Sequence, residues 1–263
     1  MKRLTRRGAA MLALALAASA PAVAQDMLRG VDLTLPAYSR SDYSREEVVA
    51  LLKAQKPDAP LDLSGKSLNG VDLSGLDFSH ANLRAARLVK ARFSGAKLDG
   101  AILDQAWLLE ADLTGASLVG AHLFAAQLQR ARADGADFSR ARIAGDLTGA
   151  SLRGAKFVEA NMAADMKNQS MGLMRAVLAS AIAEGANFAG ADLMSADLRY
   201  LHAAGADFSG ASMQGADAAG ADFTGAKWDG VKAQGLDLDS AQIDAGAAAL
   251  LKDAKGLGAA RTK

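Results

Sequence analysis

A period of five residues begins at Leu61 and constrains the fold more than any other feature of the chain. From Leu61 to Gly145 the sequence reads, in fives, LDLSG, KSLNG, VDLSG, LDFSH, ANLRA, and it continues in this way with Leu or Phe at one position of nearly every five. A small apolar residue, most often Ala, stands two positions earlier. Neither the strand period of two nor the helix period of 3.6 fits this spacing over any distance.

The period suits a coil with four short sides of about five residues each. The large residue and its small partner then face the axis, and the other three residues face outward or turn the corner. Successive coils lie about 4.8 Å apart and pair their backbones as neighbouring strands do. Gly, Ser and Asp after the central residue supply turn chemistry at the corners. The sequence therefore predicts an all-β solenoid, stabilised by contacts between neighbouring coils.

The repeat frame has two irregularities. Central residues recur every five up to Ile143, and the next follows after only four, at Leu147, which predicts a pinched corner. The pattern then fails over residues 163–172 and is regular again from Leu178. A coil interrupted inside would lose its stacking on both neighbours. We therefore expect residues 163–172 to form a loop that leaves the solenoid at a corner.

These repeats resemble the A-(D/N)-L-x-x pattern of the pentapeptide-repeat family. ANLRA, ADLTG, ANFAG, ADLMS and ADFTG match the pattern as they stand, and the resemblance covers about Leu61 to Ile243. It implies a right-handed quadrilateral β-helix, and the handedness comes from the resemblance alone. Some members of this family mimic the DNA duplex and bind topoisomerases, which confers fluoroquinolone resistance. The resemblance therefore also implies one candidate function.

Residues 25–60 precede the repeat as a separate segment and contain a predicted helix. Ser44 and Glu47 form a capping box at its start, and Pro57 stops it. A short helix of this kind is marginal alone and needs a surface to cover. The open end of the repeat stack is the surface we expect it to cap.

Residues 244–263 follow the repeat region, which we place at 61–243, and are predicted to form a second capping helix and a tail. Asp244 is the expected N-cap, and Gly256 the residue just past the helix end. A solenoid needs such caps at both ends, because uncovered terminal coils stack on one another.

Residues 1–24 have the composition of an export signal. A basic amino-terminal region precedes an apolar segment, Ala9–Ala18, which is too short to span a bilayer comfortably. The Ala-Val-Ala at 22–24 then provides a cleavage site. The twin arginines Arg6 and Arg7 lack a strong hydrophobic residue directly after them, so Sec export is favoured over Tat. We expect a periplasmic or secreted mature chain without a transmembrane segment.

Composition and motifs argue against catalysis. The chain has no Cys, which excludes disulfides, thiol catalysis and Cys–zinc sites. His80, His122 and His202 have no metal-ligand spacing, and no nucleophile elbow, phosphate loop or carboxylate pair is recognisable. A solid solenoid also offers no cavity that could shelter a reaction from water. We therefore predict that the protein is not an enzyme and has no catalytic residue, cofactor, metal or small-molecule substrate.

Residues twenty positions apart stack on the same side if four repeats make one coil. This places one aromatic column inside the solenoid and one column of alternating charge outside it. The aromatic column is Phe188, Phe208 and Trp228, and the charged column is Asp72, Arg92, Asp112 and Arg132. The alternating charges would specify the register between coils, although exposed pairs contribute only about 0.2–1 kcal/mol each.

A second outer column consists of Asp197, Asp217 and Asp237 and has one sign. Like charges at strand spacing cost energy unless something neutralises them. Either these aspartates are solvated members of the repeat pattern, or they bind a cation or a basic partner. A flat column does not offer the compact oxygen cage that a divalent cation needs.

A third set of outward residues is apolar and is our candidate for a protein contact. It comprises Arg87, Val89, Trp107, Leu109 and Phe124. Trp107 and Leu109 flank a core leucine and are expected to point outward, with the Arg87 guanidinium over the Trp107 ring. Monomers rarely expose such a cluster without cause. The alternative is that the N-terminal segment, with Leu33, Leu35 and Tyr38, folds over it.

Two functions remain in consideration. The first is a non-enzymatic scaffold for protein–protein interaction in the bacterial cell envelope, with an unidentified protein partner and no nucleic acid. The alternative is a DNA-mimicking, topoisomerase-binding protein, which needs a strongly negative rod in the compartment of its target. Removing residues 1–24 leaves 26 basic and 29 acidic residues, a net charge of −3. The low charge, the interleaved signs and the export signal favour the scaffold.

Overall fold

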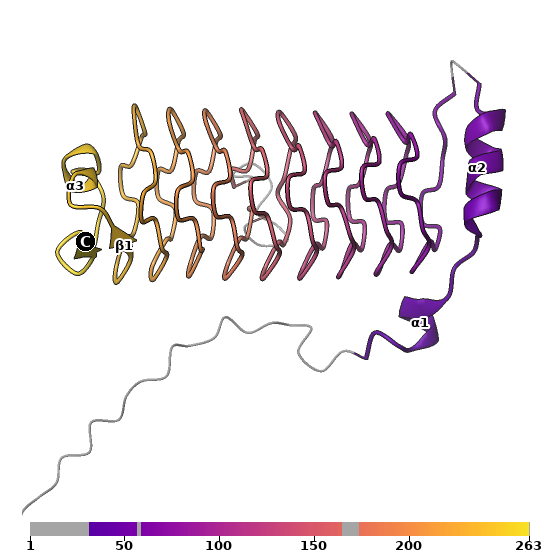
Figure 1. Cartoon of the computed structure of the whole chain (residues 1–263), viewed down its shortest axis with the longest axis horizontal. Coiled ribbons are helices and arrows are strands. Elements are labelled where there is room, and N and C mark those ends of the chain that lie inside the picture. The colour runs from indigo at the N-terminus through magenta and orange to yellow at the C-terminus, as the bar shows by residue number, and fades with distance from the viewer. Residues whose placement is uncertain (1–31, 57–58, 165–173, 263) are drawn as a thin grey trace, which may run out of the picture. The chain divides into compact units, whose positions relative to one another are not determined.

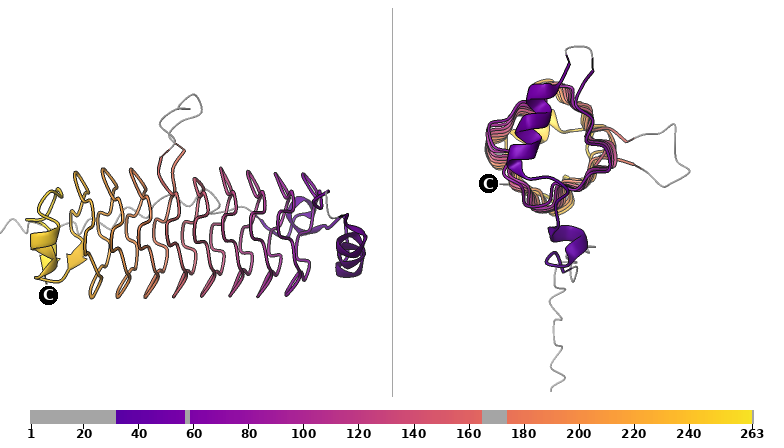
Figure 2. Two further views of the ribbon diagram at one scale, coloured as in Figure 1. Left: turned by 90° about the horizontal axis from the view of Figure 1, so that it is seen from above. Right: turned by 90° about the vertical axis from the view of Figure 1, so that its right-hand side faces the viewer.

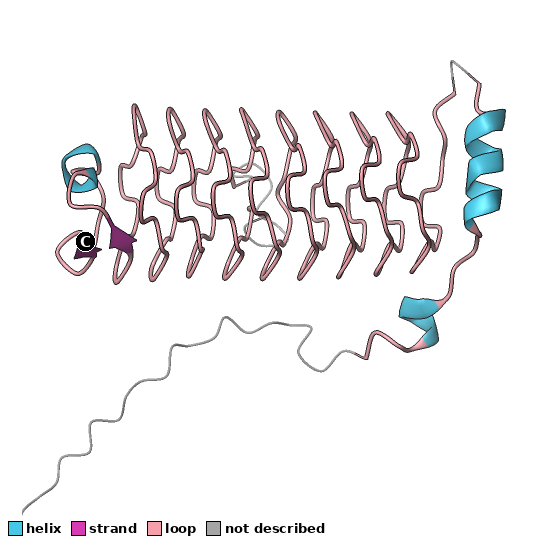
Figure 3. Ribbon diagram, in the orientation of Figure 1, coloured by secondary structure: helices cyan, strands magenta, loops and turns pink. Residues whose placement is uncertain are grey.

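The computed structural model describes residues 32–56, 59–164 and 174–262, and the predicted export signal lies outside these ranges. The repeat region is a stack of coils (Figures 1 and 3), and each coil has a four-sided outline along the stacking axis (Figure 2). The helices and strands are α1 Pro36–Ser39, α2 Arg45–Ala54, β1 Gln242–Ile243, α3 Ala247–Leu250 and β2 Arg261–Thr262. Within the described ranges, no helix has the length and apolar character needed to cross a membrane.

Each side of a coil pairs with the next coil through one bridging residue. Asp62 pairs in parallel with Asn82, and Asn82 pairs with Ile102, a spacing of twenty residues. Leu63 N donates to Asn82 O at 2.8 Å, and the ladder repeats along the stack. Because a two-residue turn follows nearly every central residue, the sides are too short for extended strands. Among the described residues, only β1 and β2 are longer than a single bridge.

The Asp or Asn of the repeat pattern satisfies a backbone donor at the corner. Asp112 Oδ1, for example, accepts a hydrogen bond from the backbone N of Thr114, two residues later, at 3.1 Å. Where this position holds another residue, the preceding coil can supply the acceptor, as when Asn69 Oδ1 accepts from Val89 N at 2.9 Å. The acidic residues of the repeat are therefore turn acceptors first, because a buried N–H without a partner is costly.

The interior is filled by the central Leu and Phe residues and by the alanines two positions earlier. The predicted aromatic column is confirmed, since Phe188 stacks on Phe208 at 5.0 Å and Phe208 on Trp228 at 5.1 Å between ring centroids. Phe157 extends the column, with its ring 4.8 Å from that of Phe188. The solenoid therefore has a continuous solid core.

Both irregularities of the repeat lie at corners. The missing residue shortens the spacing to nineteen, where Asp146 pairs with Gln127. The extra residues lie between Asn161 and Val177, which pair with Asp192 and Asp197 of the next coil. The coils on both sides of the insertion therefore stay paired, as predicted. Residues 165–173 lie outside the described part of the chain.

The N-terminal cap supplies donors to the open edge of the first coil. The predicted capping box of α2 is confirmed, with Ser44 Oγ accepting from Glu47 N and Glu47 Oε2 accepting from Ser44 N. Arg45 donates to Asp72 O at 2.7 Å and to Ser74 O at 3.0 Å. No coil precedes these carbonyls, so the Arg45 guanidinium takes the place of the backbone N–H groups that would otherwise pair with them.

We expect Arg45→Met to lower the free energy of unfolding by about 1–3 kcal/mol, because the edge carbonyls lose charged donors while the aliphatic stem remains. Lys53→Met on the same helix is the control, since Lys53 is exposed. Urea unfolding followed by circular dichroism measures both. Equal stability of the two variants would contradict the capping role.

The C-terminal cap differs from the prediction. The helix is limited to α3, and Asp244 is not its side-chain cap, because its Oδ2 accepts from Gly225 N at 2.8 Å. The chain then turns back, so that Lys255 pairs with Asp237 and β2 pairs in parallel with β1. The last coil has an open edge of unpaired backbone groups, and a tail that pairs with them is favoured over a longer helix.

Candidate functional site

Both sets of candidate residues lie along one outer side of the solenoid, which we call the Trp107 face. Its outward residues, linked by successive bridges, are Ser67, Arg87, Trp107, Gln127, Asp146, Val177, Asp197, Asp217 and Asp237. Val89 and Leu109 lie in the corner that follows this side, and Phe124 lies in the corner that precedes it. The apolar set and the acidic column therefore share one side, with Trp107 four coils, roughly 19 Å, from Asp197.

The prediction that Val89 and Leu109 are exposed is wrong. Val89 has 0% and Leu109 1% of its surface exposed, yet neither belongs to the continuous core. The cover comes from the N-terminal segment, residues 32–40, which we call the strap. Leu33 of the strap is buried, and the Tyr38 ring stacks on the Trp107 ring with centroids 6.0 Å apart. The alternative interpretation, in which this segment folds over the apolar residues, is therefore the correct one for these positions.

The strap is fixed at its C-terminal end. Ser67 Oγ donates to Arg40 O at 2.6 Å, and Asn69 Nδ2 donates to the same oxygen at 3.1 Å. Leu35, which was also expected to cover the apolar residues, is 50% exposed. Leu33 and Tyr38 therefore provide the cover, and Leu35 does not.

Two polar atoms of the Trp107 face and its corner lack a hydrogen-bond partner among the described residues: Arg87 Nε, a donor, and Gln129 Oε1, an acceptor. Gln129 is 7% exposed, and its Nε2 donates to Asp146 Oδ2 at 2.7 Å. A buried polar atom left unpaired costs about 1–3 kcal/mol. Among the described residues, the ring that stacks on Trp107 is that of Tyr38, and the expected contact of the Arg87 guanidinium with Trp107 is not found.

Phe124 is half-buried and contributes a different contact. The guanidinium carbon of Arg142 lies 5.9 Å from the centre of its ring. The backbone N of Phe124 donates to Asp104 Oδ1 at 3.0 Å. Phe124 therefore lies outside the strap contact and forms the opposite border of the Trp107 face.

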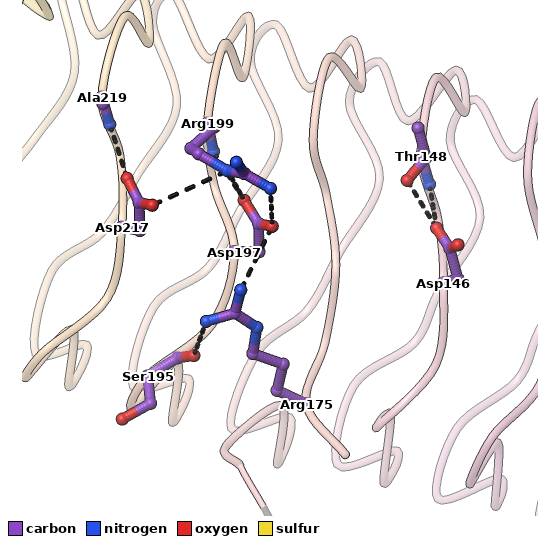
Figure 4. Close-up of polar contacts among 8 residues, drawn as sticks. All are labelled: Asp146, Thr148, Arg175, Ser195, Asp197, Arg199, Asp217 and Ala219. Atoms are coloured by element: carbon purple, nitrogen blue, oxygen red, sulfur yellow. Dashed lines mark hydrogen bonds and ion pairs between the residues drawn. The ribbon is translucent and has the colours of Figure 1, made fainter. Parts of the chain in front are cut away.

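Two of the three aspartates of the acidic column, Asp197 and Asp217, are paired with arginines of the same chain (Figure 4). Arg199 donates to Asp197 through Nε at 2.8 Å and Nη2 at 2.6 Å, and its Nε lies 3.6 Å from Asp217 Oδ2. Arg175 Nη2 reaches Asp197 Oδ2 from the other side at 3.3 Å. Asp237 accepts from Asp239 N at 3.0 Å, as the turn pattern requires. These arginines supply the positive charge for which the sequence suggested an external cation.

Sequence reasoning missed both arginines. Arg199 stands two positions after Asp197, so the turn geometry was sufficient to predict that the two side chains lie close together. Arg175 follows the irregular stretch, where the repeat frame gives no position. The described residues contain no group of three His, Cys, Asp or Glu side chains that could hold a metal ion.

Burial alone would raise the pKa of Asp197, but hydrogen bonds from Arg199 and the charges of Arg199 and Arg175 outweigh it and hold this pKa below its ordinary value. Asp197 is buried, with 3% of its surface exposed. An unfolded aspartate has a pKa of about 3.9. Because the folded pKa is lower, the cluster stabilises the protein above about pH 4, and this stabilisation is lost as the pH falls through the folded pKa.

Asp197→Asn keeps the turn acceptor and removes the charge, so we expect it to lower the free energy of unfolding at pH 7 by about 1–2 kcal/mol. The difference from the wild type should shrink between pH 5 and pH 3. Asp217→Asn is the control, because Asp217 is more exposed and contacts Arg199 at a longer distance. Urea midpoints across this pH range provide the measurement, and a difference that stays constant with pH would contradict the assignment.

Two hollows of the described part lie under its end caps. One, of about 490 Å³, lies between α2 and the first coil, with Leu52, Lys53 and Asp77 in its lining. Another, of about 580 Å³, lies between Leu250 of α3 and the last coils. Both are open to solvent, and neither belongs to the Trp107 face.

Comparison with known proteins identifies the repeat. A family model described as pentapeptide repeats matches in eight copies, over residues 67–105, 108–145, 173–210 and 193–227. No curated protein sequence gives a significant match.

Several solved structures are also similar to the chain. HetL, a pentapeptide repeat protein involved in heterocyst differentiation regulation in the cyanobacterium Nostoc, is 24% identical, over 74% of this chain and 96% of its own, with a TM-score of 0.28. QnrB1, a plasmid-mediated fluoroquinolone resistance protein, is 18% identical, over 73% of this chain and 91% of its own, with a TM-score of 0.43. A pentapeptide repeat protein of the Arabidopsis thaliana thylakoid lumen is 28% identical, over 52% of this chain and 74% of its own, with a TM-score of 0.15. The family assignment rests on the repeat match.

Proposed function

The chain belongs to the pentapeptide-repeat family, and we propose that it is a non-enzymatic scaffold that holds a protein partner in the bacterial cell envelope. We assign to it the right-handed quadrilateral β-helix of its family. The observation that carries the proposal is the solid core, in which stacked rings such as Phe157, Phe188 and Phe208 fill the axis. Recognition is thereby left to the outer sides and the end caps, and the pattern of residues 1–24 supports export.

The Trp107 face is the side that we assign to the partner. It is supported by the half-exposed Trp107, by Phe124 beside it, and by the concentration of aromatic and charged groups on one side. Interface centres are typically enriched in Trp, Tyr and Arg. The other sides have mostly polar or charged outward residues, as in the ladder that starts with Asp72.

The DNA-mimicking alternative requires free negative charge along the rod. Here the charge ladder is confirmed, with Arg92 and Asp72 at 2.9 Å and Arg132 and Asp112 also at 2.9 Å. The carboxylates of the ladder are paired with arginines, as is Asp197. We therefore expect the purified mature chain to leave gyrase supercoiling unchanged. Inhibition of gyrase supercoiling at a low protein concentration would favour the DNA-mimicking function over the scaffold function.

Cell fractionation and the mass of the isolated protein test the location. We expect the chain in the periplasm or the medium, with a mass that corresponds to removal of residues 1–24. A cytoplasmic protein that retains Met1 would overturn the envelope assignment.

Partner binding is tested by pull-down from envelope extract with the wild type and with Trp107→Ser. Thr114→Ala, on a different side, is the matched control, since the hydroxyl that it removes donates to Asp112 of the same turn. We expect Trp107→Ser to lose specific partners that Thr114→Ala retains. An identical set of partners for all three proteins would remove the Trp107 face from the proposal.

A further inference from the structure

The strap lies on the Trp107 face of the first coils, where Arg40 O accepts from Ser67 Oγ and Asn69 Nδ2 and the Tyr38 ring stacks on Trp107. The corner residues there are Asn69, Val89, Leu109 and Gln129, with exposed fractions of 4%, 0%, 1% and 7%. At the same corner in later coils, Thr148 and Arg199 are half-exposed. Ala179, at the same corner beyond the insertion, is 1% exposed, so a small side chain is buried there without the strap. The strap therefore accounts for the burial of the larger side chains Val89 and Leu109.

The strap satisfies only part of this surface, since Arg40 O accepts from Ser67 Oγ and Asn69 Nδ2. Arg87 Nε and Gln129 Oε1 are buried and have no hydrogen-bond partner within the described residues. The strap's own polar groups bond to each other instead, as Asp32 Oδ1 accepts from Thr34 Oγ1 at 2.6 Å. One donor and one acceptor on the covered surface are therefore unused by the present occupant.

The strap is also held by few contacts. Helix α1 has four residues and no side-chain cap, and Leu35 next to it is half exposed. Among the described residues, the contacts of residues 32–39 with the coils include the buried Leu33, the ring contact of Tyr38 with Trp107 and the charge interaction of Asp32 with Lys90. The firm hydrogen bonds begin at Arg40, where the segment joins the N-terminal cap. Residues 32–39 can therefore leave the surface while the cap stays in place.

We propose that the Trp107 face of the first four coils is a peptide-binding surface that the strap occludes in cis. The partner is an extended peptide segment in which an acidic residue adjoins an aromatic one. The aromatic ring takes the place of Tyr38 on Trp107. Arg87 is the bridge partner of Trp107 in the neighbouring coil. A peptide carboxylate next to the bound aromatic ring therefore reaches Arg87 Nε, the donor without a partner. A backbone N–H of the peptide then pairs with Gln129 Oε1.

This inference rests on the proposed scaffold function, because it names the class of partner that the same face holds. It is tested in solution with purified protein, so its failure leaves the cellular pull-down result unaffected. The probe is a fluorescein-labelled peptide with the strap sequence DLTLPAYSR, together with DLTLPAYER, which places a carboxylate beside the tyrosine, and DLTLPASSR, which lacks the ring.

Fluorescence anisotropy is measured with the full chain and with the Leu33→Ala/Tyr38→Ala double variant, whose strap is loosened. We expect the double variant to bind DLTLPAYSR at least tenfold more tightly than the wild type, and DLTLPASSR not to bind. DLTLPAYER should bind at least fivefold more tightly than DLTLPAYSR. Adding Arg87→Met to the double variant should abolish that fivefold gain.

Two readouts confirm the state of the protein. An unchanged melting temperature shows that the solenoid is intact, and the emission of Trp107 reports strap opening against the constant background of the buried Trp228. If no peptide binds the double variant, the proposed peptide-binding surface is refuted. The acidic partner is refuted if DLTLPAYER binds no more tightly than DLTLPAYSR. It is also refuted if the gain in affinity is as large in the variant that carries Arg87→Met.

Discussion

Replacing Phe188 with alanine is expected to lower the free energy of unfolding by about 3–5 kcal/mol. The ring is fully buried and lies between two others, 4.8 Å from the Phe157 centroid and 5.0 Å from the Phe208 centroid. Phe157 and Phe188 belong to coils on either side of the insertion, so their contact joins the two halves of the stack. A cavity at this position removes packing from both neighbours, and urea unfolding followed by circular dichroism measures the loss.

Phe188→Leu is the matched control, because it keeps most of the volume and should cost less than about 1.5 kcal/mol. Stability in a solenoid is approximately a sum of nearest-neighbour terms, so the alanine variant should show its fastest amide exchange in the coils next to the insertion. Exchange that rises evenly from one end of the stack to the other would contradict this localised effect.

Gly145→Ala is expected to destabilise the protein by about 3 kcal/mol, because the pinched corner has no room for a side chain. A Cβ there would lie 2.6 Å from Ala126 O and 3.1 Å from Leu123 O, both of them backbone atoms held by the coil. The shortened turn brings the backbone at Gly145 against the preceding coil. A side chain at this position could be accommodated only if the backbone of one of the two coils moved. Thermal and urea unfolding measure the effect.

Two other glycines separate this clash from ordinary backbone strain. Gly135 has a φ of 67°, and a Cβ at this position would meet no atom within 4 Å, so alanine there should cost only the left-handed penalty of about 1–2 kcal/mol. Gly246 has neither a clash nor a positive φ, and alanine there should be nearly neutral. If Gly145→Ala proves as mild as Gly246→Ala, the corner is more adaptable than its contacts indicate.

The candidate site was only partly predictable. The repeat frame placed Trp107 on an outer side and put the aspartates of the acidic column at coil spacing. Cover of the apolar residues by the N-terminal segment was one of two alternatives that the sequence left open. It failed for Val89 and Leu109, because the frame states which way a residue points and not what lies over it. The contact of Arg175 could not be predicted for a different reason. Arg175 follows an irregular stretch, so the repeat pattern does not assign it to a side of the coil.

The sequence alone determined the repeat frame, the buried central residues, the aromatic column and the corners at which the frame breaks. Each of these depends on residues five or twenty positions apart, and a repeating chain satisfies such contacts in one register. Only the tertiary structure decided where the segments without repeats lie, namely the strap over Val89 and Leu109 and the tail that pairs with the last coil. Their positions depend on non-local contacts with a surface that exists only after the coils have stacked.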